Sequence, residues 1–414
     1  MSAELNSVPS AQSRRPPQAA SLDKKYNIRP FKHVHQPSEQ IDYANLDAID
    51  LSTFEWGDSD EAKKSRQRLA RQLDHSVRTH GFFYLVNHGV DEGIISHLDS
   101  ISQSIFEVSN EIKAQHLAGS LSSDLDTDSV GAERGPGFKP RQYWNMANGV
   151  KDNIEFYNFT QIQHQDKMWE QNHPQIVKDY LNEIANYYQF LHFVVLKQLT
   201  ILCDIILELP EGTWYENYFQ VSQGDISGSG GGFGRLMMYY GHSDEDNEKT
   251  NNTWLRGHSD SAGFTFIASQ PMVSLQILDY RTREWRYVKH VPGALVVNIG
   301  DAVEFMTGGY FKSTIHRVVN PPKSQQGHVR HSIIYFSKPS WVTVIDPDEI
   351  DSPLLHRLGV SKPREWEKIT YYDWDLEKGR LFGKSKVNDK PGDAPEPVYI
   401  HGRLSERWIR DLSV

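Results

Sequence analysis

Four His-x-Asp pairs occur in the 414 residues, and one of them has the setting that a metal site requires. His258 and Asp260 stand between the segment TWLRG and the apolar run GFTFIAS. In a strand, residues i and i+2 point to the same side about 6.6 to 7 Å apart, so both side chains can close on one ion. The sequence therefore predicts a metal-binding pair here, with a capping or hydrogen-bonded surface pair as the alternative.

The other three His-x-Asp pairs are expected to be exposed. One lies in a segment with helical periodicity, where residues i and i+2 diverge by about 200° and form part of a solvated face. The other two lie in a polar stretch and in an acidic loop, where exposed charge is the ordinary interpretation. The pairs are, in that order, His97/Asp99, His164/Asp166 and His242/Asp244.

A third ligand is needed to hold a divalent ion firmly, and His316 is the candidate. It lies in the apolar segment STIHRVV, whose pattern predicts a buried strand. A buried imidazole needs a partner, so His316 is either a hydrogen-bonded core histidine or a companion of His258 and Asp260. Two histidines and one carboxylate on a β scaffold form the facial set of non-haem iron(II) oxygenases. Zinc, manganese or cobalt could occupy the same set in vitro.

An arginine is expected on the same wall as His316. The loop NPPKSQQGH separates TIHRVV from VRHSIIYF, which predicts a hairpin with His316 and Arg330 nearly level on one face. Ser332 follows Arg330 two residues later on that face. A buried guanidinium requires an anion, either an internal Asp or Glu or the carboxylate of a bound ligand.

The elements that must position these residues fall into a helical first half and a strand-rich second half. Apolar residues at helical spacing predict helices around 69–80, 94–112 and 176–206, and FFYLVNHGV predicts a buried strand. From Arg235 to about Val344 the period is two. The segments predicted as strands there are RLMMYY, FTFIAS, SLQIL, WRYV, ALVVNI, AVEFM, TIHRVV, SIIYF and WVTV. Eight or so strands at this spacing predict a barrel or a two-sheet jelly roll.

Composition along the chain predicts four segments. Residues 1–40 are rich in Ser, Pro, Gln and Ala and are expected to be a disordered tail. Residues 41–225 carry the predicted helices, including a long bracing helix, and residues 226–345 the jelly-roll core. Residues 346–414 contain enough large apolar side chains to pack on that core. Residues 118–137 are predicted to be a mobile surface loop.

Three conspicuous features receive structural interpretations. Cys203, the single cysteine, lies in an apolar helical run and is expected to be a packed small hydrophobe rather than a nucleophile. The glycine-rich run 228–234 lacks the Lys-Ser/Thr of a phosphate loop and does not have dinucleotide-binding spacing, so a flexible lead-in to a strand is predicted. The aromatic and basic segment 137–144 suits either a pocket lining or a packing loop.

Overall composition bounds the classes of function. A net charge of −10 gives no basic surface for nucleic acid or anionic lipid. One cysteine cannot form an intramolecular disulfide or a thiolate zinc cage, and neither a secretion signal nor a membrane span is recognisable. We therefore expect a cytoplasmic protein that binds a small-molecule substrate, with no nucleic-acid or membrane partner. The composition leaves the oligomeric state open.

The ordered motifs resemble those of a known enzyme family. The segments HSDSAGFTFIAS, VSLQIL, EWRYVKHVPGALVVNIGDAVEFMTGGYFKSTIHRVVNPP and VRHSIIYFSKP are similar to the core of the soluble iron(II)/2-oxoglutarate-dependent dioxygenases, in the branch of isopenicillin N synthase. ARQLDHSVRTHGFFYLVNHGV resembles the N-terminal region of the same family. The resemblance covers about 45–120 and 230–345. It implies a mainly β fold with flanking helices (α+β) around a double-stranded β-helix, or jelly-roll, core.

The resemblance also implies roles for individual residues. The implied iron ligands are His258, Asp260 and His316, and the implied clamp on the far carboxylate of 2-oxoglutarate is Arg330 with Ser332 and Tyr240. The family often has Asn-Tyr-Tyr-Pro where this chain has Met-Tyr-Tyr-Gly at 238–241. Because of that departure, Tyr239 is the alternative to Tyr240.

The implied activity couples decarboxylation of 2-oxoglutarate, to succinate and CO2, with oxidation of a C–H bond in a small organic molecule. Iron(II), 2-oxoglutarate and O2 are the implied cofactor and cosubstrates, with ascorbate as a candidate reductant. Hydroxylation, desaturation and ring closure are all compatible, and specialised metabolism is a candidate setting. Two alternatives stay open: an iron oxidase of the same fold that does not use 2-oxoglutarate, and a catalytically silent barrel that binds a metal or ligand.

Overall fold

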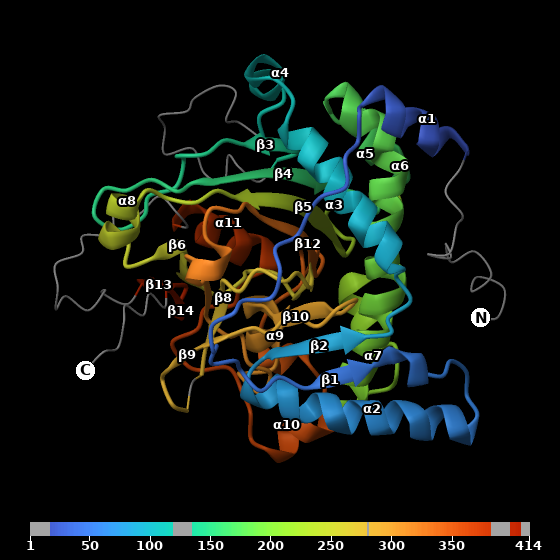
Figure 1. Ribbon diagram of the computed structural model, residues 1–414. Helices are drawn as coiled ribbons and strands as arrows, with labels where there is room; N and C mark the ends of the chain where they lie inside the picture. The colour runs from blue at the N-terminus through green and yellow to red at the C-terminus, as the bar shows by residue number, and fades with distance from the viewer. Residues whose placement is uncertain (1–16, 119–134, 280, 382–397, 407–414) are drawn as a thin grey trace.

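An eight-stranded sheet forms the centre of the computed structural model, which describes residues 17–118, 135–279, 281–381 and 398–406 (Figure 1). The strand order is β1-β2-β10-β7-β12-β5-β4-β3. Only β1 and β2 run parallel among these paired strands of the described chain. The strands are β1 (Ala48–Asp50), β2 (Phe82–Val86), β3 (Gly137–Lys139), β4 (Ile154–Thr160), β5 (Gly231–Tyr239), β7 (Phe264–Ala268), β10 (Leu295–Ile299) and β12 (Arg330–Lys338). Strands β1 to β4 come from residues before 226, so the first half of the chain shares one sheet with the second.

A four-stranded sheet packs against the large one. Its order is β6-β11-β8-β9, formed by β6 (Thr253–His258), β11 (His316–Val319), β8 (Leu275–Leu278) and β9 (Trp285–Tyr287). An apolar cluster with members from both sheets, among them Phe156, Met237, Ile277 and Val318, lies between them. The two-sheet jelly roll predicted from the strand spacing is therefore confirmed. A separate hairpin joins β13 (Val398–Ile400) to β14 (Arg403–Glu406).

The ladder between β5 and β12 forms one wall of the space between the sheets. Nine residues of each strand pair, with Arg330 opposite Tyr239. Side chains of a strand alternate between its two faces. The residues of β5 that line the space between the sheets are Phe233, Arg235, Met237 and Tyr239. Leu236 and Met238, between them, join the core on the helical side.

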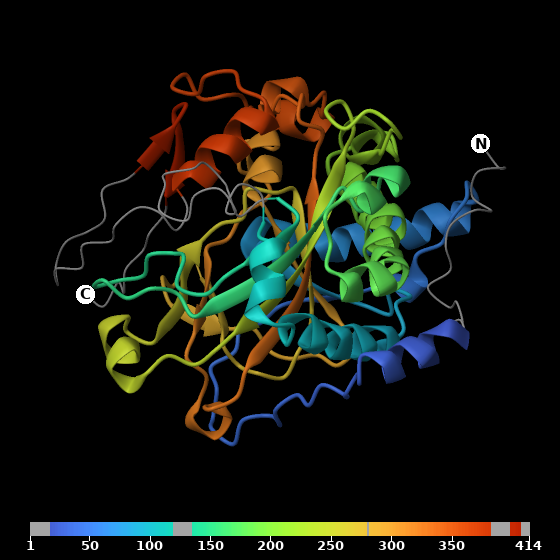
Figure 2. The same cartoon turned by 90° about the horizontal axis from the view of Figure 1, so that it is seen from above.

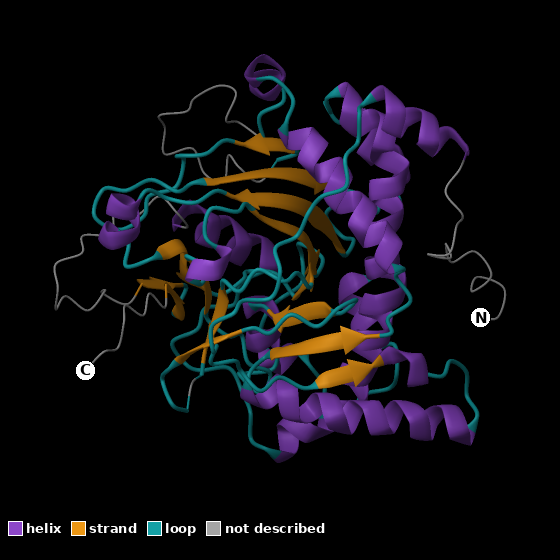
Figure 3. Cartoon of the chain, viewed as in Figure 1, coloured by secondary structure: helices purple, strands orange, loops and turns teal. Residues whose placement is uncertain are grey.

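Helices cover the outer face of the large sheet (Figure 3). Helix α6 (Gln175–Phe190), the π-helical turn η5 (Leu191–Leu196) and α7 (Lys197–Ile206) are continuous, close to the predicted 176–206. By length and composition this rod could cross a membrane. However, 78% of its apolar window is buried inside the fold, as in the core helix of a globular protein. Its side chains pack in one cluster with Tyr157, Leu236 and Tyr335 of the sheet.

The remaining helices are shorter or lie at the margins. Helix α2 (Asp60–Thr79) begins where the Ser59 hydroxyl accepts a hydrogen bond from the Ala62 N–H, and α3 (Glu92–Phe106) begins at Asp91 in the same way. The others are α1 (Pro17–Lys25), α4 (Asn110–Gln115), α5 (Gln165–Glu170), α8 (Asp244–Lys249), α9 (Asp301–Met306), α10 (Pro353–Arg357) and α11 (Tyr371–Leu381). Short turns are η2 (Leu51–Thr53), η6 (Tyr215–Phe219), η7 (Lys323–Gln325) and η8 (Pro347–Glu349).

Much of the segment predicted to be a disordered tail is folded against the helices. Residues 1–16 lie outside the described residues, but α1 begins at Pro17. The Tyr26 hydroxyl donates to Asp179 of α6 at 2.6 Å, and Lys25 pairs with the same carboxylate. His33 bonds Asp99 of α3 at 2.8 Å. The prediction of a tail up to residue 40 is wrong from Pro17 onward, because these polar contacts and the partly buried Leu22, Ile28 and Phe31 hold the segment against the core.

The C-terminal segment packs beside α9. The Trp374 side chain of α11 is fully buried, with its ring edge-on to Phe305 of α9 at 4.7 Å between centroids. In Figure 2 these C-terminal elements, drawn red, gather on one side of the strands, and α1, drawn dark blue, lies on the other side. The core therefore lies between the two ends of the described chain.

Two segments predicted to be strands adopt other conformations. AVEFM belongs to helix α9, and its apolar residues follow the spacing i, i+1, i+3 and i+4 of a helical face rather than strict alternation. WVTV forms a turn and one isolated bridge at Val344, and Trp341 and Val342 are exposed. Most of the predicted mobile loop at 118–137 lies outside the described residues, and its end forms the start of β3.

The glycine-rich run is a packing requirement rather than a flexible lead-in. A Cβ atom at Gly234 would lie 2.2 Å from the Tyr188 ring of α6, and one at Gly230 would lie 2.3 Å from the Phe219 backbone. From Gly231 onward the run is itself part of β5. The glycines therefore allow α6 and η6 to approach the sheet closely.

We expect Gly234→Ala to lower the free energy of unfolding by about 1 to 3 kcal/mol, because the new methyl group must displace the Tyr188 ring. Gly241→Ala is the matched control, since the nearest atom to its added Cβ is 4.0 Å away and its effect should stay within about 0.5 kcal/mol. Urea unfolding of the wild type and both variants measures the two effects. Equal midpoints for the two variants would contradict the packing role.

Candidate active site

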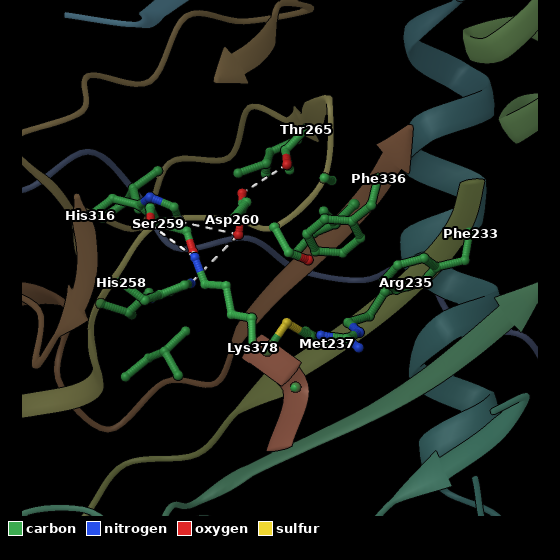
Figure 4. Close-up of a pocket in the computed structure, with 18 of the residues that line it drawn as sticks. Phe233, Arg235, Met237, His258, Ser259, Asp260, Thr265, His316, Phe336 and Lys378 are labelled. Atoms are coloured by element: carbon green, nitrogen blue, oxygen red, sulfur yellow. Dashed lines mark hydrogen bonds and ion pairs between the residues drawn. The ribbon is translucent and has the colours of Figure 1, made fainter. Parts of the chain in front are cut away.

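A pocket opens between the two sheets, and its lining includes four of the residues singled out in the sequence, His258, Asp260, His316 and Arg330 (Figure 4). It encloses about 1120 Å³ with its open mouth included. Polar lining residues come from both sheets and from α11, and are Arg235, Tyr239, His258, Ser259, Asp260, Ser261, Thr265, His316, Arg330, Lys338, Asp375 and Lys378. The apolar remainder includes Trp144, Phe233, Met237, Leu255, Ile267, Leu275, Val318, Ile334 and Phe336.

His258, Asp260 and His316 converge on one point. His258 ends β6 and His316 begins β11, and the two residues are paired across these strands. Asp260 lies in the turn after β6, and its Oδ1 is 3.7 Å from His258 Nε2 and 3.8 Å from His316 Nε2. One ligand atom from each side chain lies within 4.8 Å of the others. The structure thus brings together the three side chains that the sequence analysis selected as ligands.

Hydrogen bonds behind the three side chains fix how they face the centre. The Nδ1 atom of His258 lies 2.8 Å from the Arg256 carbonyl and that of His316 lies 3.1 Å from the Thr314 carbonyl, so each Nδ1 carries the proton and each Nε2 keeps its lone pair. The Oδ2 atom of Asp260 accepts from Thr265 Oγ1 at 2.7 Å and Asn298 Nδ2 at 2.8 Å. Its Oδ1 atom therefore faces the two histidines.

The protonation states of two of these residues suit a metal. Burial tends to raise the pKa of Asp260, but His316, His258 and the hydrogen bonds from Asn298 and Thr265 outweigh it and lower that pKa to about 2. Burial, followed by the neighbouring His316, lowers the pKa of His258 to about 3. At neutral pH the site thus offers an ionised carboxylate and a neutral imidazole, which are the forms that bind metal.

The donor set fits iron(II). Cis ligands of an octahedral ion at about 2.1 Å lie about 3.0 Å apart, so contraction of the 3.7 and 3.8 Å spacings by less than about 1 Å would complete the set. Two imidazole nitrogens and one carboxylate oxygen on one side of an ion form the facial set of non-haem iron(II) oxygenases. The open pocket on the other side leaves room for substrate ligands.

Lys378, on helix α11, contacts the turn between the first two members of this set. Its Nζ donates to the carbonyl of Ser259 at 2.8 Å and to the Ser259 hydroxyl at 3.0 Å, and it forms a buried ion pair with Asp301 of α9. Ser259 is the middle residue of His-x-Asp. Sequence analysis missed Lys378 because it lies 118 positions after Asp260, in a region outside the recognised motifs.

Arg330, Ser332 and Tyr239 form a second cluster in the same pocket. Arg330 is 4% exposed, donates to the Ser332 hydroxyl at 2.5 Å, and its guanidinium carbon lies 4.7 Å from the Tyr239 ring centroid. Burial lowers the pKa of Arg330 and raises that of Tyr239. The buried Nε of Arg330 has no hydrogen-bond partner among the residues that the structure describes. An orphaned buried guanidinium N–H is a site for an absent anion.

Tyr240 was the wrong choice of tyrosine. Its hydroxyl donates to Glu155 at 3.2 Å and its ring lies under the Arg141 guanidinium, on the face of β5 away from the pocket. Successive residues of a strand point to opposite faces, and Tyr239 is the one that pairs with Arg330. The tyrosine beside the arginine is therefore Tyr239.

Apart from Trp144, the remaining sequence candidates lie outside the pocket lining, and some of the His-x-Asp pairs are not exposed as predicted. His97 and Asp99 are buried, because α3 lies between α6 and the N-terminal segment: His97 bonds Asp23 and Glu183, and Asp99 bonds His33 and His331. His164 is also buried and His242 half-buried, whereas Asp166 and Asp244 are exposed. Cys203 is buried, and burial raises the pKa of its thiol, as expected for a packed side chain. Trp144, from the segment 137–144, does line the pocket.

Comparison with known proteins agrees with this geometry. The model of the 2OG-Fe(II) oxygenase superfamily matches residues 233–339, and that of the N-terminal region of a non-haem dioxygenase in morphine synthesis matches residues 46–179. Together the two matches span more than half of the chain. The chain belongs to the 2OG-Fe(II) oxygenase superfamily. It is an iron(II)- and 2-oxoglutarate-dependent dioxygenase, as the sequence motifs predicted.

Individual relatives are distant in sequence but similar over most of their length. The 1-aminocyclopropane-1-carboxylate oxidase of Dictyostelium mucoroides is 24% identical over 83% of this chain and 95% of its own length. Gibberellin 3-beta-dioxygenase 4 of Arabidopsis thaliana is 24% identical over 76% and 79%. Among solved structures, a full-length Neurospora crassa protein in complex with alpha-KG aligns with a TM-score of 0.62 at 18% identity over 85% of this chain and 99% of its own. JOX2 in complex with 2OG, Fe and JA aligns with a TM-score of 0.59 at 20% identity over 89% and 94%.

We expect Lys378→Met to weaken Mn(II) binding, measured by electron paramagnetic resonance, by about tenfold, because the metal-binding turn loses its buried donor. Lys378→Met also leaves the buried Asp301 carboxylate without its cation, which can destabilise the fold. The double variant Lys378→Met/Asp301→Asn removes that unpaired charge, so weak Mn(II) binding that persists in it reports the loss of positioning alone. Lys368→Met, at an exposed lysine, is the control and should bind as the wild type does. Unchanged affinity in a folded Lys378→Met protein would contradict the positioning role.

Proposed function

We propose that this dioxygenase holds iron(II) through His258, Asp260 and His316 and the far carboxylate of 2-oxoglutarate through Arg330, Ser332 and Tyr239. The observation that carries the proposal is the orphaned Nε of buried Arg330, in the pocket that also contains the three metal-binding candidates. A fork of N–H donors on a guanidinium matches the two oxygens of a carboxylate.

The residues of the chain would position the reactants and keep water out. His258 and His316 present their Nε2 lone pairs, and Asp260 presents the Oδ1 atom that Thr265 and Asn298 leave unengaged. The apolar walls around them limit solvent. Iron and 2-oxoglutarate, when bound, would supply the chemistry, in which O2 and 2-oxoglutarate oxidise a substrate C–H bond with release of succinate and CO2.

The substrate is proposed to be a small organic molecule. A pocket of about 1120 Å³, mouth included, is of the size that encloses such ligands. Two of the similar solved structures hold small molecules: the Neurospora crassa protein with thymine, and JOX2 with JA. We also propose that the enzyme works in the cytoplasm, since its single cysteine is buried and unpaired within the described chain and iron(II) persists in reducing surroundings.

Replacing His258, Asp260 or His316 by Ala should abolish O2 uptake that depends on iron(II) and 2-oxoglutarate, because two ligands hold a divalent ion too loosely. An oxygen electrode with parallel succinate assays measures the loss. His242→Ala, in another His-x-Asp pair, is the matched control and should retain full activity. A fully active His258→Ala or His316→Ala protein would overturn the assignment of the ligands.

Arg330→Gln should raise the KM for 2-oxoglutarate at least thirtyfold, since losing one partner of a buried charge-assisted pair costs about 2 kcal/mol or more. Tyr239→Phe should raise it less, and Tyr240→Phe should leave it unchanged, because Tyr240 faces away from the pocket. Succinate release at varied 2-oxoglutarate concentration gives all three values. An Arg330→Gln protein with normal KM, or O2 uptake without 2-oxoglutarate, would favour the iron oxidase instead.

A further inference from the structure

A second arginine lines the pocket at a distance from the Arg330 clamp. Arg235 precedes Tyr239 by four residues on β5, and Tyr239 pairs with Arg330. At about 3.3 Å per residue, Arg235 lies roughly 13 Å along the strand from that pair. Both residues are on the inner face, and Figure 4 shows Arg235 beside Met237 across the pocket from His258 and His316. The pocket therefore has one guanidinium beside the last residue of β5 and another on its middle residue.

Aromatic rings and an amide hold the Arg235 guanidinium in place. Its central carbon lies 3.8 Å from the Phe156 ring centroid, 5.2 Å from that of Phe233 and 5.3 Å from that of Phe336. Its Nε donates to the Asn158 side-chain oxygen at 2.8 Å. A planar guanidinium fixed in this way is already ordered before a ligand arrives, so less entropy is lost on binding.

Lys338 brings a second cation to the same rings. Phe233 and Phe336 face each other across the β5–β12 ladder and stack at 4.6 Å with an 18° tilt. Arg235 lies on one side of this stacked pair, and Lys338 on the other side has its Nζ 5.0 Å from the Phe233 centroid. Two cations within about 5 Å of one ring centroid are no more than about 10 Å apart, which one small ligand can span.

The described side chains that line this part of the pocket include more cations than carboxylates, which favours an anionic ligand. Lys338 shares its charge with Asp375 of α11, at 2.9 Å, and Lys378 shares its own with Asp301. Arg235 adds a further positive charge to the lining of the pocket. A carboxylate brings one negative charge and two oxygens in the geometry that a guanidinium binds.

Apolar side chains line the pocket between Arg235 and the metal-binding candidates. Met237 of β5 and Ile334 of β12 lie on the inner faces of their strands. Leu255 lies on β6, the strand that ends at His258, and Ile267 lies on β7, the strand that follows Asp260. A ligand anchored at Arg235 would therefore lay an apolar body toward the metal position.

We propose that the substrate is an organic acid whose carboxylate binds Arg235, with Lys338 as second cation, and whose apolar body extends toward His258, Asp260 and His316. The proposal rests on the function proposed above and names the class of its substrate. It assigns the two arginines separate ligands, Arg330 to the cosubstrate and Arg235 to the substrate.

Calorimetric titration of the Mn(II)-loaded protein at saturating 2-oxoglutarate tests the proposal without turnover. The probes are 3-phenylpropanoate, indole-3-acetate and octanoate, each paired with its methyl ester, and saturating 2-oxoglutarate keeps them from Arg330. At least one acid should bind tenfold or more tightly than its ester. The variants are Arg235→Gln, Arg235→Lys and Lys338→Gln, with the exposed Arg364→Gln as control.

Arg235→Gln should weaken the binding of the acid at least tenfold and that of its ester less than twofold. Arg235→Lys should bind the acid more tightly than Arg235→Gln does. Lys338→Gln should weaken the binding of the acid less than Arg235→Gln, and Arg364→Gln should leave it unchanged. Because the ester reports on the shape of the pocket in the same variant, a general disturbance of folding would weaken acid and ester alike. Acids that bind no tighter than their esters, or an equal loss for both in Arg235→Gln, would overturn the proposal.

The test also separates this proposal from the proposed function. A wild-type protein that releases no succinate from 2-oxoglutarate would overturn the proposed function, whatever the probes do. A wild type with normal 2-oxoglutarate turnover whose esters bind as tightly as its acids would overturn only the assignment of Arg235.

Discussion

Both oxygens of a carboxylate buried among apolar side chains need polar partners, and for Asp260 these partners come from both sheets. Thr265 and Asn298, on β7 and β10 of the large sheet, hold Oδ2, while His258 and His316, on β6 and β11 of the small sheet, face Oδ1. The two sheets must therefore keep a fixed separation and register at this point. The geometry of the rest of the pocket depends on this arrangement, because the same strands form its walls.

The metal-binding candidates could be predicted because strand geometry reduces them to local patterns. A His-x-Asp pair next to an apolar strand places both side chains on one side, and His316 lies in a short strand of its own whose residues are mostly buried. For His258 and Asp260, residues close in sequence determine the geometry. The hairpin predicted to place Arg330 level with His316 is wrong, because β11 pairs with β6 and β8 in the small sheet whereas β12 pairs with β5 and β7 in the large one. Arg330 nevertheless lines the same pocket as His316, because the two sheets face each other across it.

The failures share a different cause, which is contact between segments far apart in the chain. Whether Tyr239 or Tyr240 faces inward depends on the pairing of β5 with β12, about ninety residues later, and a shift of one residue reverses the answer. Asp99 is buried because His33 and His331 reach it from two distant segments, although its own helix pattern predicts exposure. Arg235 and Lys338 likewise become neighbours only across the ladder. Sequence periodicity carries no information on such pairings.

Helix α11 makes two attachments that bear on how this enzyme can change during evolution. Through Lys378 it holds the backbone of the metal-binding turn, and through Asp375 it contacts Lys338 at 2.9 Å and the Ser261 hydroxyl at 2.6 Å, on the wall of the substrate pocket. In many enzymes a peripheral helix can be exchanged or lost to alter specificity while the catalytic centre is left intact. Here a single helix serves both, so a C-terminal replacement that opens the pocket to a new substrate would at the same time loosen the metal. Selection for new substrates should therefore act on the loops and strands opposite α11, and the helix itself should diverge slowly.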